Sequence, residues 1–231
     1  MQEVIIIGGG NSVREGIDKG LWDKIKGKEI WSLNSVFKLM PYLPSKQLWV
    51  DNSFFKHEIG ELQKLHKQGV HMISKNYRRL ADLDKEITQY GSTRDIKNYH
   101  GKQAIEKNEI FYGRMGLCGQ FALSLAVAMK FINIFLIGYD FGSKSLEEKK
   151  THWYQDKIKD LNIHSNGAGR PQVYLKPDGK PRRELEDWKV YLRETDVNIW
   201  NVSLISHLTY YPRISYEEFF EKLEKLKCQT G

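Results

Sequence analysis

The first twelve residues constrain the fold of this chain more strongly than any other segment. Four β-branched residues at 4–7 run directly into a turn of three glycines, and Asn11 and Ser12 then begin a segment with helical spacing. Such a run is typical of a strand that is covered on both faces of a parallel sheet. Glycines allow positive φ angles and close approach of another group, and Asn11 or Ser12 can cap the following helix. The segment predicts a strand-turn-helix unit.

The start of a helix that follows such a turn is a good anion site, because its N–H groups are free and its dipole end is positive. We therefore predict a nucleotide-phosphate site at Gly8, Gly9, Gly10, Asn11 and Ser12. The segment is neither a complete G-x-G-x-x-G motif nor a Walker A motif, which ends in Gly-Lys-Ser/Thr. The alternative interpretation is a tight strand-to-helix turn that binds nothing.

Composition sets broad limits on the class of protein. The 231 residues suit one domain, and the net charge of +7 favours anionic partners such as nucleotides, nucleic acid or phosphorylated glycans. The two cysteines do not form a disulfide framework. We expect no signal peptide, because a strand already begins at residue 4, and no membrane span, so the expected location is the cytoplasm.

Short apolar segments alternate with segments of helical period. The predicted strands are 4–7, 29–33, 47–50, 70–74, 110–112, 134–138 and 197–202, and the predicted helices are 13–25, 53–67, 119–130, 184–194 and 216–227. This alternation predicts an α/β fold with a mostly parallel twisted sheet and helices on both faces. We predict a single domain over 1–231, with a polar lid insertion at about 144–183.

Aromatic residues favour a lid over a bare linker. Trp153 and Tyr154 lie in the polar insertion, and Tyr210 and Tyr211 follow the last predicted strand. Long segments without secondary structure are commonly functional lids. We therefore expect these four residues to stack on a base or sugar at the acceptor side of the site.

Polar residues follow several predicted strands, where ligands bind in α/β sheets. They are Asn34, the run Asp51-Asn52-Ser53, Arg114 and Asp140. Asn34 and Asn52 can pair with base or ribose edges, or they are ordinary turn residues. Arg114 can clamp a diphosphate, or it is a solvated turn residue. Asp140 can bind a metal ion or a ribose hydroxyl, or it caps a turn.

These segments together resemble a known superfamily. The motifs are Ile-Gly-Gly-Gly-Asn-Ser at 7–12, Ser-Leu-Asn-Ser at 32–35, Val-Asp-Asn-Ser at 50–53, the segment 114–141 that ends in Gly-Tyr-Asp-Phe, Thr-His-Trp at 151–153, and 201–212. They resemble the Rossmann-like group that contains the bacterial family 42 sialyltransferases and the archaeal 6-hydroxymethylpterin diphosphokinases. The resemblance is greater still to small uncharacterised members carried by tailed phages.

The sialyltransferase branch implies a nucleotide-sugar donor and no cofactor. In that branch the glycine turn and the asparagines after strands two and three hold the nucleotide, which corresponds here to Gly8–Ser12, Asn34 and Asn52. A small turn that opens the central helix also touches the donor, and its counterpart includes Cys118 and Gly119. A nucleophilic role for Cys118 is not expected, because no Cys-His signature accompanies it.

The diphosphokinase branch implies ATP and Mg²⁺. There, a Thr-His pair follows the Gly-x-Asp strand end, as Thr151-His152 does here. This resemblance makes Asp140 a metal ligand, with Asp51 as a second candidate.

The leading functional prediction is a glycosyltransferase that uses a nucleotide-sugar, with His152 as the general base and Asp140 and Arg114 as further catalytic residues. The alternative is an ATP- and Mg²⁺-dependent diphosphokinase. A third alternative is a non-catalytic nucleotide or nucleic-acid binding module, because the segment 176–183 has no histidine in the place of the family's base. A phage origin would make a modified DNA base or a glycan the acceptor. The sequence leaves the oligomeric state open.

Overall fold

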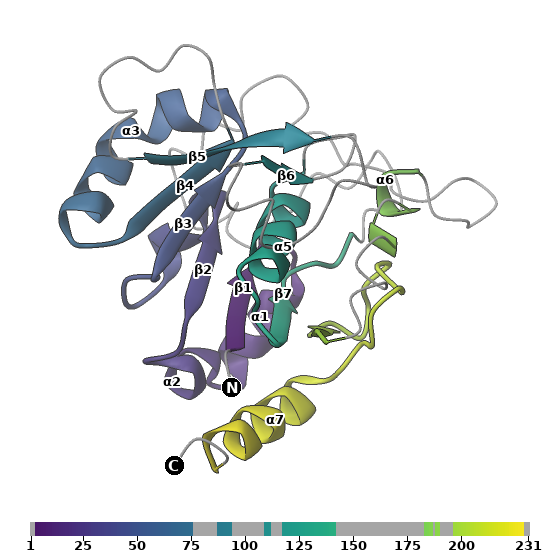
Figure 1. Cartoon of the computed structure of the whole chain (residues 1–231). Helices are drawn as coiled ribbons and strands as arrows, with labels where there is room; N and C mark the ends of the chain where they lie inside the picture. Colours follow the sequence, from purple (N-terminus) through teal and green to yellow (C-terminus); the bar gives the residue numbers. More distant parts are fainter. Residues whose placement is uncertain are drawn as a thin grey trace, which may run out of the picture.

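The computed structural model describes residues 3–75, 87–93, 109–111, 117–141, 183–186, 188–189 and 196–228. Eight strands form one sheet in the order β6-β5-β4-β3-β2-β1-β7-β8, and every pairing is parallel (Figure 1). The strands are β1 (Glu3–Ile7), β2 (Ile30–Leu33), β3 (Lys46–Trp49), β4 (His71–Lys75), β5 (Ile87–Thr93), β6 (Glu109–Phe111), β7 (Asn133–Ile137) and β8 (Asn198–Asn201). This confirms the predicted α/β fold.

The strand order reverses beside β1. Strands β2 to β6 are added on one side of β1, and the chain then crosses back and places β7 and β8 on the other side. The reversal therefore lies between β1 and β7, which pair in register from Glu3↔Asn133 to Ile7↔Ile137. Ligands of open α/β sheets bind outside the carboxyl ends of the strands at such a reversal.

Helices cover both faces of the sheet. They are α1 (Ser12–Asp18), α2 (Leu21–Ile25), the 3₁₀ helix η1 (Asn34–Leu39), α3 (Asn52–Lys67), α5 (Cys118–Ala128), α6 (Arg183–Glu186) and α7 (Tyr216–Cys228). Alternate residues of β1 face opposite layers: Val4 and Ile6 join the core cluster of α5, whereas Ile5 and Ile7 join that of α1, α2 and α7. All four are fully buried, as the predicted two-sided strand requires.

Two local expectations need correction. The helix predicted over 13–25 is two helices, because Gly20 has a φ of 78° and separates α1 from α2. A left-handed residue cannot continue a right-handed helix, and glycine adopts this conformation at little cost. Strand β5 and helix η1 were not predicted, since the β5 sequence Ile-Thr-Gln-Tyr-Gly-Ser-Thr has no apolar run.

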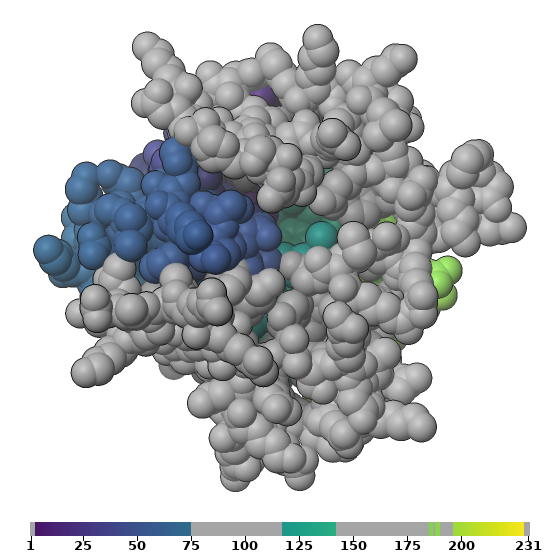
Figure 2. Space-filling model, turned by 90° about the horizontal axis from the view of Figure 1, so that it is seen from above, coloured from purple at the N-terminus to yellow at the C-terminus, as the bar shows by residue number. Residues whose placement is uncertain are grey.

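The predicted lid at 144–182 lies outside the described residues, and residue 183 begins α6. No helix within the described ranges has the length and apolar character that crossing a bilayer requires. Seen from above Figure 1, blue residues of the first third of the chain and teal residues around α5 both reach the surface between grey atoms (Figure 2).

Candidate functional site

The candidate site lies at the carboxyl ends of β1, β2, β3 and β7. Helices η1 and α3 begin there because they follow β2 and β3 directly. Helix α5 precedes β7 and therefore runs in the opposite direction, so it also begins at this edge, where it packs over β1 and β3. The fold thus brings the predicted residues Gly8–Ser12, Asn34, Asp51–Ser53, Cys118, Gly119 and Asp140 to one edge of the sheet.

The glycine turn is packed against the turn that follows β7. The amide of Gly8 donates to the carbonyl of Ile137 (2.7 Å), and that of Gly10 to the carbonyl of Gly138 (2.8 Å). A Cβ atom on Gly10 would lie 2.7 Å from the Asp140 carboxyl group. Positive φ angles in the described residues occur elsewhere and not at Gly8–Gly10, so close approach, and not a left-handed conformation, is what requires glycine at Gly10. The group that approaches the glycines closely is the turn at Gly138–Asp140 of the same chain.

Asp140 caps helix α1 from a distance. Its carboxylate accepts hydrogen bonds from the backbone N–H of Ser12 (2.7 Å) and from the Ser12 hydroxyl (2.5 Å). Both residues are buried, and Asn11, although it precedes the helix, makes no side-chain capping bond. Asp140 thus takes the capping role, one of the alternatives open from the sequence, and Asn11 does not. No three His, Cys, Asp or Glu side chains of the described chain form a cluster that could hold a metal ion.

Asn34 is held in an unusual conformation at the end of β2. Its φ is 49°, in the left-handed region, and its carbonyl accepts a hydrogen bond from Gln47 Nε2 (2.9 Å). Gln47 is fixed in turn by the hydroxyl of Ser32, which donates to its Oε1. The Asn34 Oδ1 atom is buried and has no hydrogen-bond partner among the described residues. An unpaired buried acceptor costs about 1–3 kcal/mol, so a donor from a ligand would stabilise this arrangement.

The run after β3 begins helix α3 and is open to solvent. Asp51, Asn52 and Ser53 are all exposed, and Asp51 occupies the cap position without a side-chain capping bond. Their exposure leaves these side chains accessible to a ligand at this edge.

Cys118 and Gly119, at the start of α5, are both packed closely against neighbouring residues. The Cys118 thiol lies against the Leu48 carbonyl (3.6 Å) and the backbone of Asn34. Burial raises the pKa of this thiol, and the charge of Asp51 adds to the effect. Cys118 is therefore a protonated thiol at neutral pH and a poor nucleophile. A Cβ atom on Gly119 would lie 2.7 Å from the Tyr139 ring, which is why the position needs glycine.

The first turn of α5 presents hydrogen-bond donors without acceptors. Leu117 precedes the helix and cannot cap it, and the amides of Cys118, Gly119 and Gln120 bond to none of the described residues. Gln120 is 1% exposed, and its buried Nε2 atom has no hydrogen-bond partner in the described part of the chain. Unpaired amides at a helix start attract anions. The start of α5 therefore has backbone amides available for an anion, whereas those of Gly8, Gly10 and Ser12 in the glycine turn are already bonded.

Residues after β8 brace the site, and the sequence did not identify them as functional. The Ser206 hydroxyl donates to the Tyr139 carbonyl (2.6 Å), and Asn201 Nδ2 donates to Ser206 Oγ (2.8 Å). The backbone N–H of His207 donates to the Asp140 carbonyl (2.8 Å). The sequence signal for them was the segment 201–212, which belonged to the family resemblance but assigned no role to Asn201, Ser206 or His207.

The aromatic residues predicted for the acceptor side differ in their placement. Tyr211 is 3% exposed, and its hydroxyl donates to the Trp188 carbonyl (2.7 Å). Its ring belongs to the core, so the expected stacking role of Tyr211 is wrong. Tyr210 is half-buried and carries the Lys189 ammonium over its ring at 5.0 Å. The other predicted residues, Arg114, His152, Trp153 and Tyr154, lie outside the described residues.

No family model and no curated protein matches the chain. Solved structures do match it. The sialyltransferase CST-II in complex with a trisaccharide acceptor and CMP aligns with a TM-score of 0.54 and 14% identity, over 93% of this chain and 86% of that one. CstII from Campylobacter jejuni in complex with CMP-3FNeuAc gives 0.51 at 14% identity, with the same coverage. The MAf glycosyltransferase of Magnetospirillum magneticum AMB-1 gives 0.56 at 16% identity, over 99% of this chain and 37% of that one. These similarities show a glycosyltransferase-like α/β fold.

Proposed function

We propose that this chain is a glycosyltransferase that uses a nucleotide-sugar donor and needs no metal cofactor. Its fold is that of the solved glycosyltransferases, one of which was crystallised with CMP and a trisaccharide acceptor. The low identity leaves the donor and the acceptor to be argued from the site itself. The acceptor is a hydroxyl-bearing molecule, either a glycan or a modified DNA base.

The observation that carries the proposal is a group of unsatisfied polar atoms at one edge of the sheet. They are the first amides of α5, Gln120 Nε2 and Asn34 Oδ1. The thiol of Cys118 lies against the Asn34 backbone, so the start of α5 and Asn34 are neighbours. Because buried polar groups in native proteins are nearly always paired, a ligand with both acceptors and donors accounts for all of them.

A nucleotide supplies this combination of groups. Its phosphate would accept hydrogen bonds from the α5 amides, and its base or ribose would donate to Asn34 and pair with Asn52 beside it. During transfer the negative charge on the leaving phosphate grows, and oriented amides stabilise that charge more than they stabilise the bound donor. The start of α5 would therefore accelerate departure of the nucleotide.

The acceptor side of the proposal rests on the sequence. We assign removal of the acceptor hydroxyl proton to His152, since a histidine that titrates near neutrality can take this proton. We assign a phosphate contact to Arg114, and contacts with the sugar or acceptor to Trp153 and Tyr154.

A thermal-shift panel of nucleotides and nucleotide-sugars, with and without Mg²⁺, tests the proposal. A ligand at ~100 times its Kd stabilises the folded state by about 2.7 kcal/mol. A metal-independent shift with a pyrimidine nucleotide or its sugar supports it. A shift with ATP and Mg²⁺ alone supports a diphosphokinase instead, and salt-dependent binding of DNA or RNA without nucleotide binding supports a nucleic-acid module. No shift with any ligand refutes a nucleotide site.

Asn34→Gly is the sharpest variant for the same test. Glycine accepts the φ of 49° and removes only the side-chain amide. We expect the variant to fold and to bind the nucleotide about tenfold more weakly, the equivalent of one hydrogen bond of about 1.4 kcal/mol. Lys130→Gly is the matched control, because Lys130 is exposed and has a φ of 65° at the far end of α5. Equal affinities of the two variants would count against the proposed pocket.

The diphosphokinase alternative has a geometric difficulty. It needs Asp140 as a ligand for Mg²⁺, but both carboxylate oxygens of Asp140 already accept hydrogen bonds from Ser12. Lone pairs remain on both oxygens, but a metal ion would have to reach them at a residue that is only 6% exposed. We therefore rank pyrophosphoryl transfer from ATP second.

A further inference from the structure

Asp140 places its carboxylate beside the glycine turn, at the start of helix α1. Its carboxylate is 6% exposed and accepts from the Ser12 amide and hydroxyl at 2.7 and 2.5 Å. Its Cγ and Oδ2 atoms would lie 2.7 Å from a Cβ atom on Gly10, so no side chain is tolerated there. The negative charge beside the glycine turn is therefore supplied by the Asp140 carboxylate of the protein itself.

Most backbone amides of the glycine turn already donate hydrogen bonds to other residues of the protein. Those of Gly8 and Gly10 donate to the β7 turn, and that of Ser12 donates to Asp140. Those of Val13 and Arg14 donate back to Gly10 and Asn11 at 3.3 and 3.0 Å. Within the described residues, only the amides of Gly9 and Asn11 in this stretch lack an acceptor. Tight phosphate binding needs several convergent donors, which this turn no longer offers.

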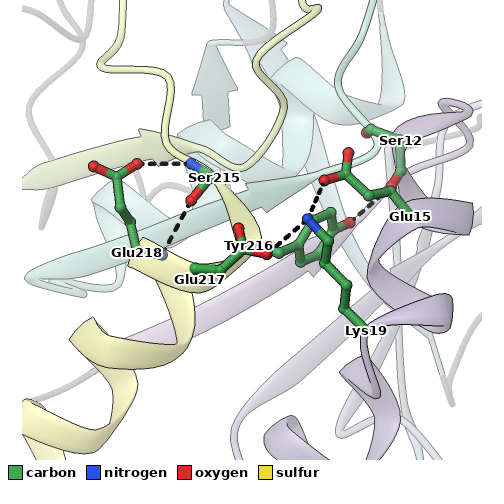
Figure 3. A network of polar contacts seen from close by, with 7 residues as sticks. All are labelled: Ser12, Glu15, Lys19, Ser215, Tyr216, Glu217 and Glu218. Carbon is green, nitrogen blue, oxygen red and sulfur yellow. Dashed lines mark hydrogen bonds and ion pairs between the residues drawn. The ribbon is translucent and has the colours of Figure 1, made fainter.

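Ser12 is also held from the opposite side, by helix α7 (Figure 3). The Tyr216 hydroxyl donates to the Ser12 carbonyl at 3.0 Å, and the Tyr216 ring lies against Gly16. All three polar groups of Ser12 are thus bonded to residues far away in the sequence.

Two surface interactions support the contact that Ser12 and Gly16 of α1 make with Tyr216 of α7, called the α1–α7 seam below. The Lys19 ammonium bridges Glu15 of α1 and Glu217 of α7 at 2.6 and 2.8 Å (Figure 3). Ser215 and Glu218 form a reciprocal capping box at the start of α7. The glycine turn and the start of α1 are therefore held in place by contacts within the protein, without a ligand.

We propose that Asp140 is a specificity-determining residue of the nucleotide site. Its carboxylate fills the anion position at the glycine turn and repels ligand phosphate from it, so that the donor phosphate binds at the start of α5. The identity of the ligand rests on the proposed function, but the exclusion of phosphate from the turn does not.

Asp140→Asn tests the charge. The amide can accept from the Ser12 N–H and donate to the Ser12 hydroxyl, so we expect the fold to be kept. By calorimetry, inorganic pyrophosphate should bind this variant about fivefold more tightly than the parent chain, because a like charge is removed. Asp18→Asn, at the exposed end of α1, makes the same change in net charge and should leave the affinity unchanged. Equal pyrophosphate affinities of the parent and Asp140→Asn overturn the proposal.

Asp140→Ala tests the position. Sodium formate should replace the deleted carboxylate and raise the Tm of this variant more than sodium chloride does at the same ionic strength. The parent chain should respond equally to both salts, and adding Ser12→Ala should abolish the specific effect of formate. Equal responses of Asp140→Ala to the two salts overturn the proposal, and so does formate rescue without tighter pyrophosphate binding in Asp140→Asn. Failure of the nucleotide panel while both effects persist would refute the proposed function alone.

Discussion

Two helical glycines allow the contact between α1 and α7 to be measured by the same substitution in two surroundings. Gly16 lies in α1 and Gly60 in α3, and neither has a positive φ. A Cβ atom on Gly60 would meet nothing within 4 Å, whereas one on Gly16 would lie 2.4 Å from the Tyr216 ring. That ring is 2% exposed and its hydroxyl is bonded to Ser12, so it has little freedom to move away.

The expected changes in stability have opposite signs. Replacing a helical glycine with alanine stabilises the helix by about 0.5–1 kcal/mol, and Gly60→Ala should gain this in full. Gly16→Ala gains the same amount but overpacks the seam, which costs about 1–3 kcal/mol. From the middle of these two ranges we expect a net loss of about 1 kcal/mol, and at most about 2.5 kcal/mol, in the free energy of unfolding for Gly16→Ala.

Urea denaturation and thermal melts measure both variants. At ~2–4 °C per kcal/mol for a chain of this size, Gly60→Ala should raise Tm and Gly16→Ala should lower it. Combining Gly16→Ala with Tyr216→Leu should cost less than the sum of the two single changes, since the shorter side chain relieves the overlap. If Gly16→Ala proves as stabilising as Gly60→Ala, the packing of α7 on α1 described above is incorrect.

Further predictions concern the same seam and the buried thiol. Tyr216→Phe removes one buried hydrogen bond and should cost about 1 kcal/mol by urea denaturation; no loss would contradict the bond. Burial and the charge of the nearby carboxylate raise the pKa of Tyr216, so ultraviolet titration should lose one late-ionising phenol in this variant. In the native protein a thiol reagent should modify Cys228, which is exposed, and spare Cys118 until urea is added; rapid modification of both would contradict the burial. The hydrogen bond from Lys19 lowers the pKa of Glu217 from its usual 4.5 to about 2. This interaction therefore stabilises the fold above pH ~4.5 and is lost as the pH falls toward 2. Glu217→Gln should flatten the acid dependence of stability in that window, and an unchanged curve would show that the ion pair contributes nothing.

The central strands were predictable because their residues are short apolar runs that have to be buried. Residues 4–7 and 134–137 are short apolar runs, largely β-branched at 4–7, that are typical of a strand covered on both faces, and the structure buries all of them. Strand β5 lacks this signal, since its pairing with β4 and β6, rather than its own composition, makes it a strand. The break at Gly20 was missed because one glycine is tolerated in many helices and only its φ reveals the end of α1.

Much of the candidate site followed from the rule that ligands bind at the carboxyl ends of parallel strands. This rule brought Asn34, Asp51 and Asp140 to one edge without any knowledge of side-chain contacts. It could not show that Asn34 would be left-handed or that its Oδ1 would be unpaired. It also could not separate Tyr210 from Tyr211, because the core position of Tyr211 depends on a contact with Trp188 across the fold.

The cap of α1 shows why the local sequence pattern at the glycine turn was misleading. Asn11 is adjacent to the helix and of a suitable type, yet the cap comes from Asp140, which is 128 residues from Ser12. The parallel pairing of β1 with β7 brings the two turns together and makes the distant carboxylate the nearer partner. Because the cap joins residues 128 apart in sequence, forming it closes a long loop, which carries an entropic cost. One buried aspartate thus links the start of α1 to the far side of β1, so its replacement should affect the stability of α1 whether or not the proposed nucleotide site exists.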